Sequence, residues 1–169
     1  MFSAVIATGK HGELGKNGDM PWKRNLPSDL KFVKELTMGK SILMGANTFN
    51  SLPKLLPGRK HFVATFDINE LDSKYDPNNE NISIIFDLKQ FLENNFYTEN
   101  EFVIFGGASV YNLAIPYCCK VYFTRLDQGF NHCDTFFNYH FDQNKYTKTA
   151  IGSQSENGLS YTRYLYEKK

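Results

Sequence analysis

The chain has 169 residues and carries 19 Lys and Arg against 18 Asp and Glu, which gives a formal net charge of +1 at pH 7. This length suits one domain with a core of its own, and 41% hydrophobic with 22% charged residues is typical of a globular rather than a disordered chain. The near-neutral charge argues against a nucleic-acid or membrane-surface binder, and no apolar run reaches the roughly 20 residues needed to cross a bilayer.

Apolar segments of strand and helix character alternate along the chain. Strands are predicted at Phe2–Thr8, Ser41–Gly45, His61–Phe66, Ile82–Phe86, Phe102–Phe105, Lys120–Leu126, Tyr146–Ile151 and Leu159–Tyr166. Helices or helical turns are predicted at Pro27–Thr37, Asn47–Leu52, Leu88–Glu93 and Ala108–Ile115. This order indicates an α/β fold, a mostly parallel twisted sheet of about eight strands flanked by four helices. A Gly-Ser-Gln-Ser-Glu-Asn-Gly turn before the last strand predicts an antiparallel C-terminal strand, within one domain spanning residues 1–169.

The cysteines and the N-terminus indicate the cellular compartment of the protein and whether it binds a metal. Cys118, Cys119 and Cys133 are an odd number and form a poor disulfide framework, which suggests a reducing compartment. His132 and His140 lie near Cys133 but match no zinc spacing, so we expect no metal. The N-terminus has no basic region ahead of its apolar residues and is interpreted as a strand rather than a signal peptide. We expect a cytoplasmic protein.

Asp29 is the most informative residue, because it falls on the apolar face of the predicted helix Pro27–Thr37. Four apolar side chains share that face at about 100° per residue: Leu26, Leu30, Val33 and Leu36. A carboxylate there is costly unless it is paired or used, and desolvation favours its protonated form, which suits proton transfer near neutral pH. The alternative is that Asp29 caps the start of its own helix.

Three further segments are candidates for binding. A strand runs through Gly106-Gly107 into the helix Ala108–Ile115, where close backbone approach and free helix N–H groups favour a phosphate. A full GxGxxG motif is absent, so the common Rossmann fingerprint does not apply. The alternative to a phosphate site is a tight strand-to-helix turn in which the glycines are purely structural. The glycine-rich segment Gly9–Trp22 predicts a lid, with a plain surface loop as the alternative. Arg59 is either a surface residue or a bidentate clamp for a carboxylate, and pattern alone favours the surface.

In this order, the motifs of the chain resemble those of dihydrofolate reductase. The matching residues are Ala7, Leu14-Gly15, Met20-Pro21-Trp22, Leu26-Pro27-x-Asp29-Leu30, Met44-Gly45-x-x-Thr48-Phe49, Leu56-Pro57-Gly58-Arg59-Lys60, Phe105-Gly106-Gly107, Val110-Tyr111, Tyr122-x-Thr124 and Asp134-Thr135-x-Phe137. The resemblance covers essentially the whole chain. It implies a bacterial-type enzyme that uses NADPH to reduce 7,8-dihydrofolate to 5,6,7,8-tetrahydrofolate for one-carbon metabolism and thymidylate synthesis. It further implies antifolate inhibitors as ligands, and we expect a monomer.

The resemblance also implies roles for individual residues. Asp29 would hold the pterin and assist protonation of N5, Trp22 would position an ordered water, and Thr124 would hydrogen-bond to Asp29. The substrate-binding residues would be Val5, Ala7, Asp29, Leu30, Val33, Leu52, Arg59 and Thr124, with Arg59 on the glutamate tail. The cofactor-binding residues would be Ala7, Leu14, Gly15, Met20, Asn47, Thr48, Thr65, Phe105, Gly106, Gly107, Ala108, Ser109, Val110 and Tyr111. The segment around Met20 would close over the nicotinamide.

The chain departs from the family pattern where the 2′-phosphate of NADPH is usually held. Ala46 and Asn47 replace an arginine and a second basic or polar residue, and Phe66 replaces a serine. Asp67 lies just beyond, and an acid near the ribose disfavours a phosphate. We therefore expect NADPH as cofactor with weak discrimination against NADH.

Two other functions stay open at this level. One is a related reductase acting on a ribosylated pyrimidine, which would need neither Arg59 as a tail clamp nor Asp29 in this setting. The other is a non-catalytic nucleotide- or pterin-binding module, and the joint presence of Asp29, Trp22 and Thr124 argues against it.

Overall fold

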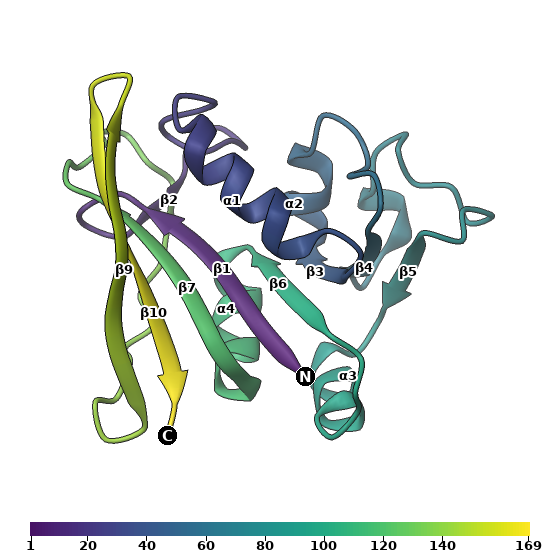
Figure 1. Ribbon diagram of the computed structural model, residues 1–169. Helices are drawn as coiled ribbons and strands as arrows, with labels where there is room; N and C mark the ends of the chain where they lie inside the picture. The colour runs from purple at the N-terminus through teal and green to yellow at the C-terminus, as the bar shows by residue number, and fades with distance from the viewer.

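The computed structural model describes residues 1–169 and contains one large sheet. Its strands are β1 (Phe2–Thr8), β3 (Ser41–Gly45), β4 (Lys60–Ala64), β5 (Ile82–Ile85), β6 (Phe102–Gly106), β7 (Cys118–Leu126), β9 (Tyr146–Glu156) and β10 (Leu159–Lys168). They lie in the order β5-β4-β3-β6-β1-β7-β10-β9 (Figure 1). The six strands from β5 to β7 are parallel, and β10 runs antiparallel to both β7 and β9. The predicted α/β fold with an antiparallel C-terminal strand is confirmed.

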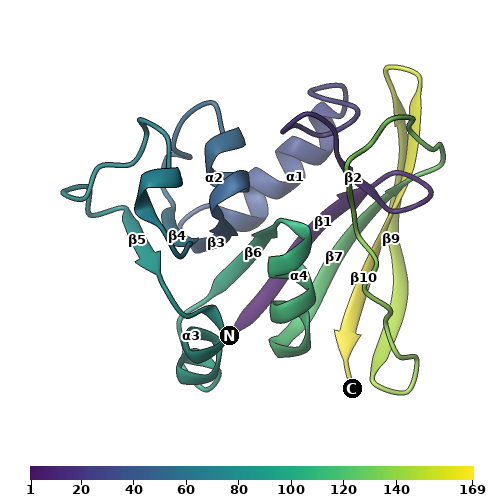
Figure 2. The same cartoon turned by 180° about the vertical axis from the view of Figure 1, so that it is seen from behind.

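Helices cover both faces of this sheet. They are α1 (Pro27–Thr37), α2 (Ala46–Ser51), α3 (Leu88–Asn95) and α4 (Ala108–Ala114), with short 3₁₀ turns η1 (Ile68–Glu70) and η2 (Ile115–Tyr117). Helix α1 crosses one face and α4 lies on the opposite face, as the two views show (Figures 1 and 2). None of these helices combines the length and the apolar character that crossing a membrane requires.

The core follows the alternation of side chains along the central strands. In β1, Ala4 and Ile6 pack in the cluster on the α4 side, whereas Val5 between them packs on the α1 side. The same alternation separates Ile104 from Val103 in β6. Because successive side chains of a strand point to opposite faces, a strand covered on both sides must be apolar throughout. This explains the unbroken apolar runs in the sequence.

Most predicted elements begin and end within two residues of the observed ones. The exception is β9, which continues to Glu156 where a turn was expected after Ile151. The hairpin turn consists only of Asn157 and Gly158, whose φ angles of 50° and 76° fit a two-residue turn. Strand β9 lies at the edge of the sheet and is exposed over most of its length, so its outer residues can be polar. A prediction based on apolar runs therefore ends the strand too early.

A second, two-stranded sheet ties down the glycine-rich segment near the N-terminus. Strand β2 (Glu13–Gly15) pairs antiparallel with β8 (Thr135–Phe136), and neither was predicted. The backbone N–H of Asn17 donates to a carboxylate oxygen of Asp134 at 2.9 Å. The segment 9–22 is therefore anchored to the loop after β7 rather than lying free on the surface.

Candidate active site

A cavity of about 1110 Å³ opens where the carboxyl ends of the parallel strands meet. Ala7 of β1, Gly45 of β3, Ala64 of β4 and Thr124 of β7 line it together. This edge of a parallel sheet is the usual place for a ligand site, and the volume lies slightly above the usual range for small-molecule pockets. Two parts of the cavity differ in chemistry and are described in turn.

The first part, here called the charged end, lies along α1. It contains the cavity-lining residues of that helix together with Arg59 and Thr124. Leu30 and Val33 line it, which explains why Leu30 is 38% exposed although it belongs to the apolar face of the helix. The apolar face predicted for α1 therefore borders a cavity as well as the core.

Asp29 is the buried acid of the charged end. The Thr124 hydroxyl donates to Asp29 Oδ1 at 2.7 Å, so the hydrogen bond implied by the resemblance is present. Arg163 Nη2 donates to the same oxygen at 2.7 Å. Asp29 lies in the first turn of α1, as the alternative interpretation assumed, but no side chain makes a capping hydrogen bond there. The carboxylate instead joins α1 to β7 and β10.

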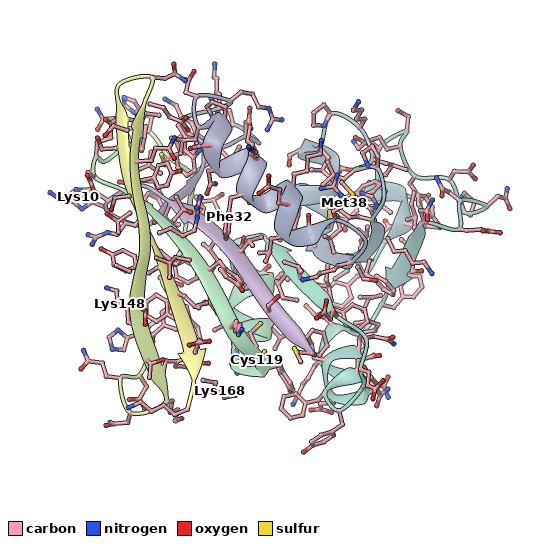
Figure 3. All side chains as sticks on the ribbon, in the orientation of Figure 1. Lys10, Phe32, Met38, Cys119, Lys148 and Lys168 are labelled. Atoms are coloured by element: carbon pink, nitrogen blue, oxygen red, sulfur yellow. The ribbon has the colours of Figure 1, made fainter.

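Arg163 was missed by the sequence analysis, because it belongs to no motif. It lies opposite Thr124 in the β10–β7 register, and its Nε donates to the Thr124 hydroxyl at 3.2 Å. Its guanidinium lies 3.7 Å from the centre of the Phe32 ring. Phe32 lies on the side of α1 that faces the sheet (Figure 3), where its ring packs against Tyr122 of β7. A signal was present: Arg163 shares the alternation of Leu159 and Tyr161, both buried, and this alternation places its charge on the inward face of the strand.

Tyr111 lines the cavity and is buried, with 4% of its surface exposed. Its hydroxyl donates to the backbone carbonyl of Val5 at 2.7 Å and so joins α4 to β1. Burial, with a contribution from the Asp29 charge, raises the pKa of Tyr111 far above its ordinary value. Tyr111 is therefore a neutral, structural hydrogen-bond donor rather than a proton carrier.

Arg59 is buried at the other extremity of α1. Its Nε donates to the Pro57 carbonyl at 3.0 Å and its Nη1 to the Thr37 hydroxyl at 3.2 Å, and no carboxylate pairs with it. Burial lowers the pKa of Arg59 from its ordinary value. The surface interpretation of Arg59 is wrong. A guanidinium that lines a cavity with donors left over is suited to an anionic ligand group.

His61 holds the loop that carries Arg59. Its Nε2 accepts the backbone N–H of Leu56 at 3.0 Å, whereas its Nδ1 is buried without a partner. Burial lowers the pKa of His61, so the imidazole is neutral at neutral pH and keeps this acceptor. These hydrogen bonds hold the loop between α2 and β4 and place Arg59 beside the C-terminal end of α1.

The second part, here called the glycine end, comprises the cavity-lining residues within 45–48, 64–70, 85–88 and 107–113. A Cβ on Gly106 would lie 2.8 Å from the Tyr111 ring, and the φ of Gly106 is +106°, so only glycine suits this position. The peptide bond between Gly106 and Gly107 is cis. Helix α4 begins here without a side-chain cap, so backbone N–H groups face the cavity beside Ala108 and Ser109.

Glu70 is the one charged side chain of the glycine end. Its carboxylate accepts a hydrogen bond from the Thr65 hydroxyl. The expectation placed Asp67 there, and this is corrected: Asp67 Oδ1 accepts the Asn69 N–H at 2.9 Å, capping η1 outside the cavity. Phe66, which follows Thr65, lines the cavity while 95% exposed, because β4 ends at Ala64 and the chain turns outward.

Nearly all residues to which the resemblance assigns a site role line the cavity. They are Val5, Ala7, Leu14, Gly15, Met20, Asp29, Leu30, Val33, Asn47, Thr48, Leu52, Arg59, Thr65, Phe105, Gly107, Ala108, Ser109, Val110, Tyr111 and Thr124. Gly106 lies just behind the lining. Trp22 is also outside it: the ring is 3% exposed and packs against Phe130 with ring centres 5.6 Å apart.

Comparison with known proteins agrees with this geometry. A family model described as dihydrofolate reductase matches residues 1–168. The chain is 33% identical over 170 residues to a dihydrofolate reductase of Bacillus subtilis (strain 168), covering 100% of this chain and 95% of that protein. It is 33% identical over 169 residues to one of Staphylococcus haemolyticus, covering 99% and 95%. The solved structure of dihydrofolate reductase from Enterococcus faecalis complexed with NADP(H) and RAB-propyl superposes with a TM-score of 0.82 at 29% identity, covering 100% of this chain and 96% of that one.

Proposed function

Because this chain belongs to the dihydrofolate reductase family, we propose that Asp29 is the group that binds the pterin ring and assists its protonation. The enzyme is an NADPH-dependent oxidoreductase that reduces dihydrofolate to tetrahydrofolate. One observation carries the assignment of Asp29: of the four acidic side chains that line the cavity it is the only buried one, held there by two donors. The two other functions considered from the sequence are set aside.

The reaction needs a hydride at C6 and a proton at N5 of the substrate. Bound NADPH supplies the hydride, and the protein supplies alignment, exclusion of water and the proton path. Asp29 Oδ1 already receives two protein hydrogen bonds, whereas Oδ2 receives none. Oδ2 is thus the oxygen that accepts hydrogen bonds from the pterin and from which the proton path begins. Trp22 supports this path indirectly, packed against Leu26 before the start of α1.

The substrate would extend along α1 from Asp29 to Arg59. Thr37, the hydrogen-bond partner of Arg59, follows Asp29 by eight residues, so about 12 Å of helix separates them. Between Asp29 and Arg59, apolar surface for the rings is supplied by Val5, Ala7, Leu30, Val33 and Leu52. A ligand with hydrogen-bond donors at one extremity and a carboxylate at the other matches this layout, as dihydrofolate does.

The backbone of the glycine end is suited to binding a dinucleotide, but its side-chain charges are not suited to a 2′-phosphate. The close-packed glycines and the uncapped start of α4 allow the pyrophosphate to approach the backbone. We propose that NADPH is held by the fourteen residues named from the resemblance. No cationic side chain lines the glycine end for a 2′-phosphate, and Glu70 places a negative charge there. Discrimination against NADH is therefore weak.

The test of the function is the Asp29→Asn variant. We expect its hydride transfer rate at pH 7 to fall by roughly 100-fold or more, as for loss of a general acid. Its affinity for NADPH should change little, because the amide fills the same volume. Its Tm should fall, because Arg163 loses its buried charged partner. Asp127→Asn removes an exposed acid and serves as the matched control. An unchanged rate in Asp29→Asn would remove Asp29 from the mechanism.

We also propose that the protein acts as a monomer. A single chain supplies both the charged end and the glycine end. Light scattering of the purified protein should give a mass near 19.5 kDa. Twice that mass at micromolar concentration would contradict the proposal.

A further inference from the structure

We propose that Arg163 is a positioning residue for substrate binding, which orients Asp29 so that Oδ2 alone is presented to the pterin. This inference rests on the proposed role of Asp29. Arg163 and Asp29 are 134 positions apart in the chain, yet their side chains meet at 2.7 Å and are 12% and 10% exposed. Such a buried contact is costly to break, because either partner alone would be an uncompensated buried charge.

The direction of approach separates Arg163 from the substrate. Asp29, Thr124 and Phe32 all line the cavity, whereas Arg163 does not. Its guanidinium therefore reaches the carboxylate from the sheet side, behind the cavity, and does not occupy the place of a ligand. An arginine placed in this way acts on the substrate only through the carboxylate that it contacts.

The contacts of Arg163 fix its own orientation. The guanidinium is stacked on Phe32 at 3.7 Å, with the Tyr161 ring at 5.4 Å. Phe32 packs in turn against Tyr122 of β7, with ring centres 5.7 Å apart. Arg stacks on aromatic rings and donates in a fixed plane, so this setting leaves it little freedom.

Arg163 and Thr124 act together on one carboxylate oxygen. Arg163 Nε donates to the Thr124 hydroxyl, which donates its proton to Asp29 Oδ1, and Arg163 Nη2 donates to that oxygen directly. The three side chains form a closed ring of hydrogen bonds from α1, β7 and β10. Both donors converge on Oδ1, so the carboxylate cannot rotate without losing them, and Oδ2 keeps its direction.

The β9–β10 hairpin that carries Arg163 also docks the start of α1, which a test must separate from the contact with Asp29. Ser28 donates its backbone N–H and its hydroxyl to Glu156, at 3.0 and 2.6 Å. Asn157 donates to the Asn25 carbonyl at 3.0 Å. A variant at Ser28 weakens docking and leaves the Arg163–Asp29 contact in place.

The experiment is a double-mutant cycle of Arg163→Met and Asp29→Asn, read as KM and kcat for dihydrofolate, with NADPH affinity and Tm as folding checks. We expect Arg163→Met to raise the KM for dihydrofolate about tenfold, as for loss of a charged hydrogen bond, with less than about threefold change in kcat. In the Asp29→Asn background the same substitution should change KM less than about twofold, because its effect passes through Asp29.

Two controls and a conservative series complete the design. Ser28→Ala loses the hydroxyl contacts with Glu156 and Tyr161 and keeps the Arg163–Asp29 contact. This variant and Arg125→Met, at an exposed arginine next to Thr124, should leave the KM for dihydrofolate within about twofold. If Arg163→Met does not fold, the KM values of Arg163→Lys and Arg163→Gln are compared instead. The lysine variant, which keeps the charge, should have a KM closer to that of the wild type than the glutamine variant.

The outcomes distinguish this inference from the proposed function. An equal effect of Arg163→Met in both backgrounds, an equal effect of Ser28→Ala, or equal KM values for the lysine and glutamine variants would overturn the role of Arg163 alone. A wild-type rate and KM in Asp29→Asn would overturn the role of Asp29 and that of Arg163 together.

Discussion

The charged end and the glycine end of one cavity are built on opposite principles. At the charged end, Asp29 and Arg59 are each held by side-chain or backbone hydrogen bonds at the two extremities of α1. At the glycine end, backbone and small residues form the surface, and Glu70 is the one charge. Fixed charges select a ligand by its polar groups, whereas a backbone surface selects it by shape.

This difference indicates how each end tolerates substitution. An isosteric change of a charged group leaves the fold and removes specific hydrogen bonds, so its effect falls on one ligand. A single added methyl group where backbone is packed against an aromatic ring disturbs the fold itself. The three substitutions that follow test this contrast, from the largest expected effect to the smallest.

Gly106→Ala should have the largest effect, a loss of folding stability, because it adds a side chain where the glycine end has no room for one. The added Cβ would lie 2.8 Å from the Tyr111 ring, at a backbone φ of +106°. Together, strain and overlap should lower the free energy of unfolding by about 3 kcal/mol, measured by urea denaturation. Gly152→Ala has no atom within 4 Å of its new Cβ and should change stability by less than about 0.5 kcal/mol. Equal stability of the two variants would refute the shape argument.

Arg59→Gln should act on substrate binding and leave the fold in place. Loss of a charged hydrogen bond to the substrate carboxylate should cost about 2 kcal/mol, a rise of roughly 30-fold in the KM for dihydrofolate. The KM for NADPH should not move. A pterin substrate without the glutamate tail should bind the variant and the wild type alike. A similar loss with that substrate would show that Arg59 does not contact the tail.

Glu70→Gln should have the smallest effect and bears on cofactor choice. The wild-type enzyme should prefer NADPH over NADH by less than about tenfold in kcat/KM, because the glycine end has no cation. Removing the Glu70 charge should raise this preference about fivefold, since an exposed charge a few ångströms away contributes about 1 kcal/mol. Glu80→Gln, an exposed acid outside the cavity, is the control. A large wild-type preference for NADPH would mean that backbone groups replace the missing cation.

The local sequence pattern was sufficient to predict the helices and the position of Asp29 on the buried face of α1. The helix Pro27–Thr37 was predicted with its observed bounds, because the apolar spacing and the proline at its start are properties of adjacent residues. The buried position of Asp29 followed from the same spacing. Arg59 was assigned to the surface on pattern alone, because its burial depends on Thr37 and on a loop held by His61.

The sequence by itself determined the four helices and the positions of the strands in the large, mostly parallel sheet, and, through the ordered motifs, the family. Only the tertiary structure decided that Arg163 meets Asp29 and that Glu70 rather than Asp67 faces the cavity. The physical reason is that periodicity reports which face of an element is buried and says nothing of what lies opposite. That depends on which strands become neighbours and in what register: Arg163 reaches the site because β10 pairs with β7 opposite Thr124.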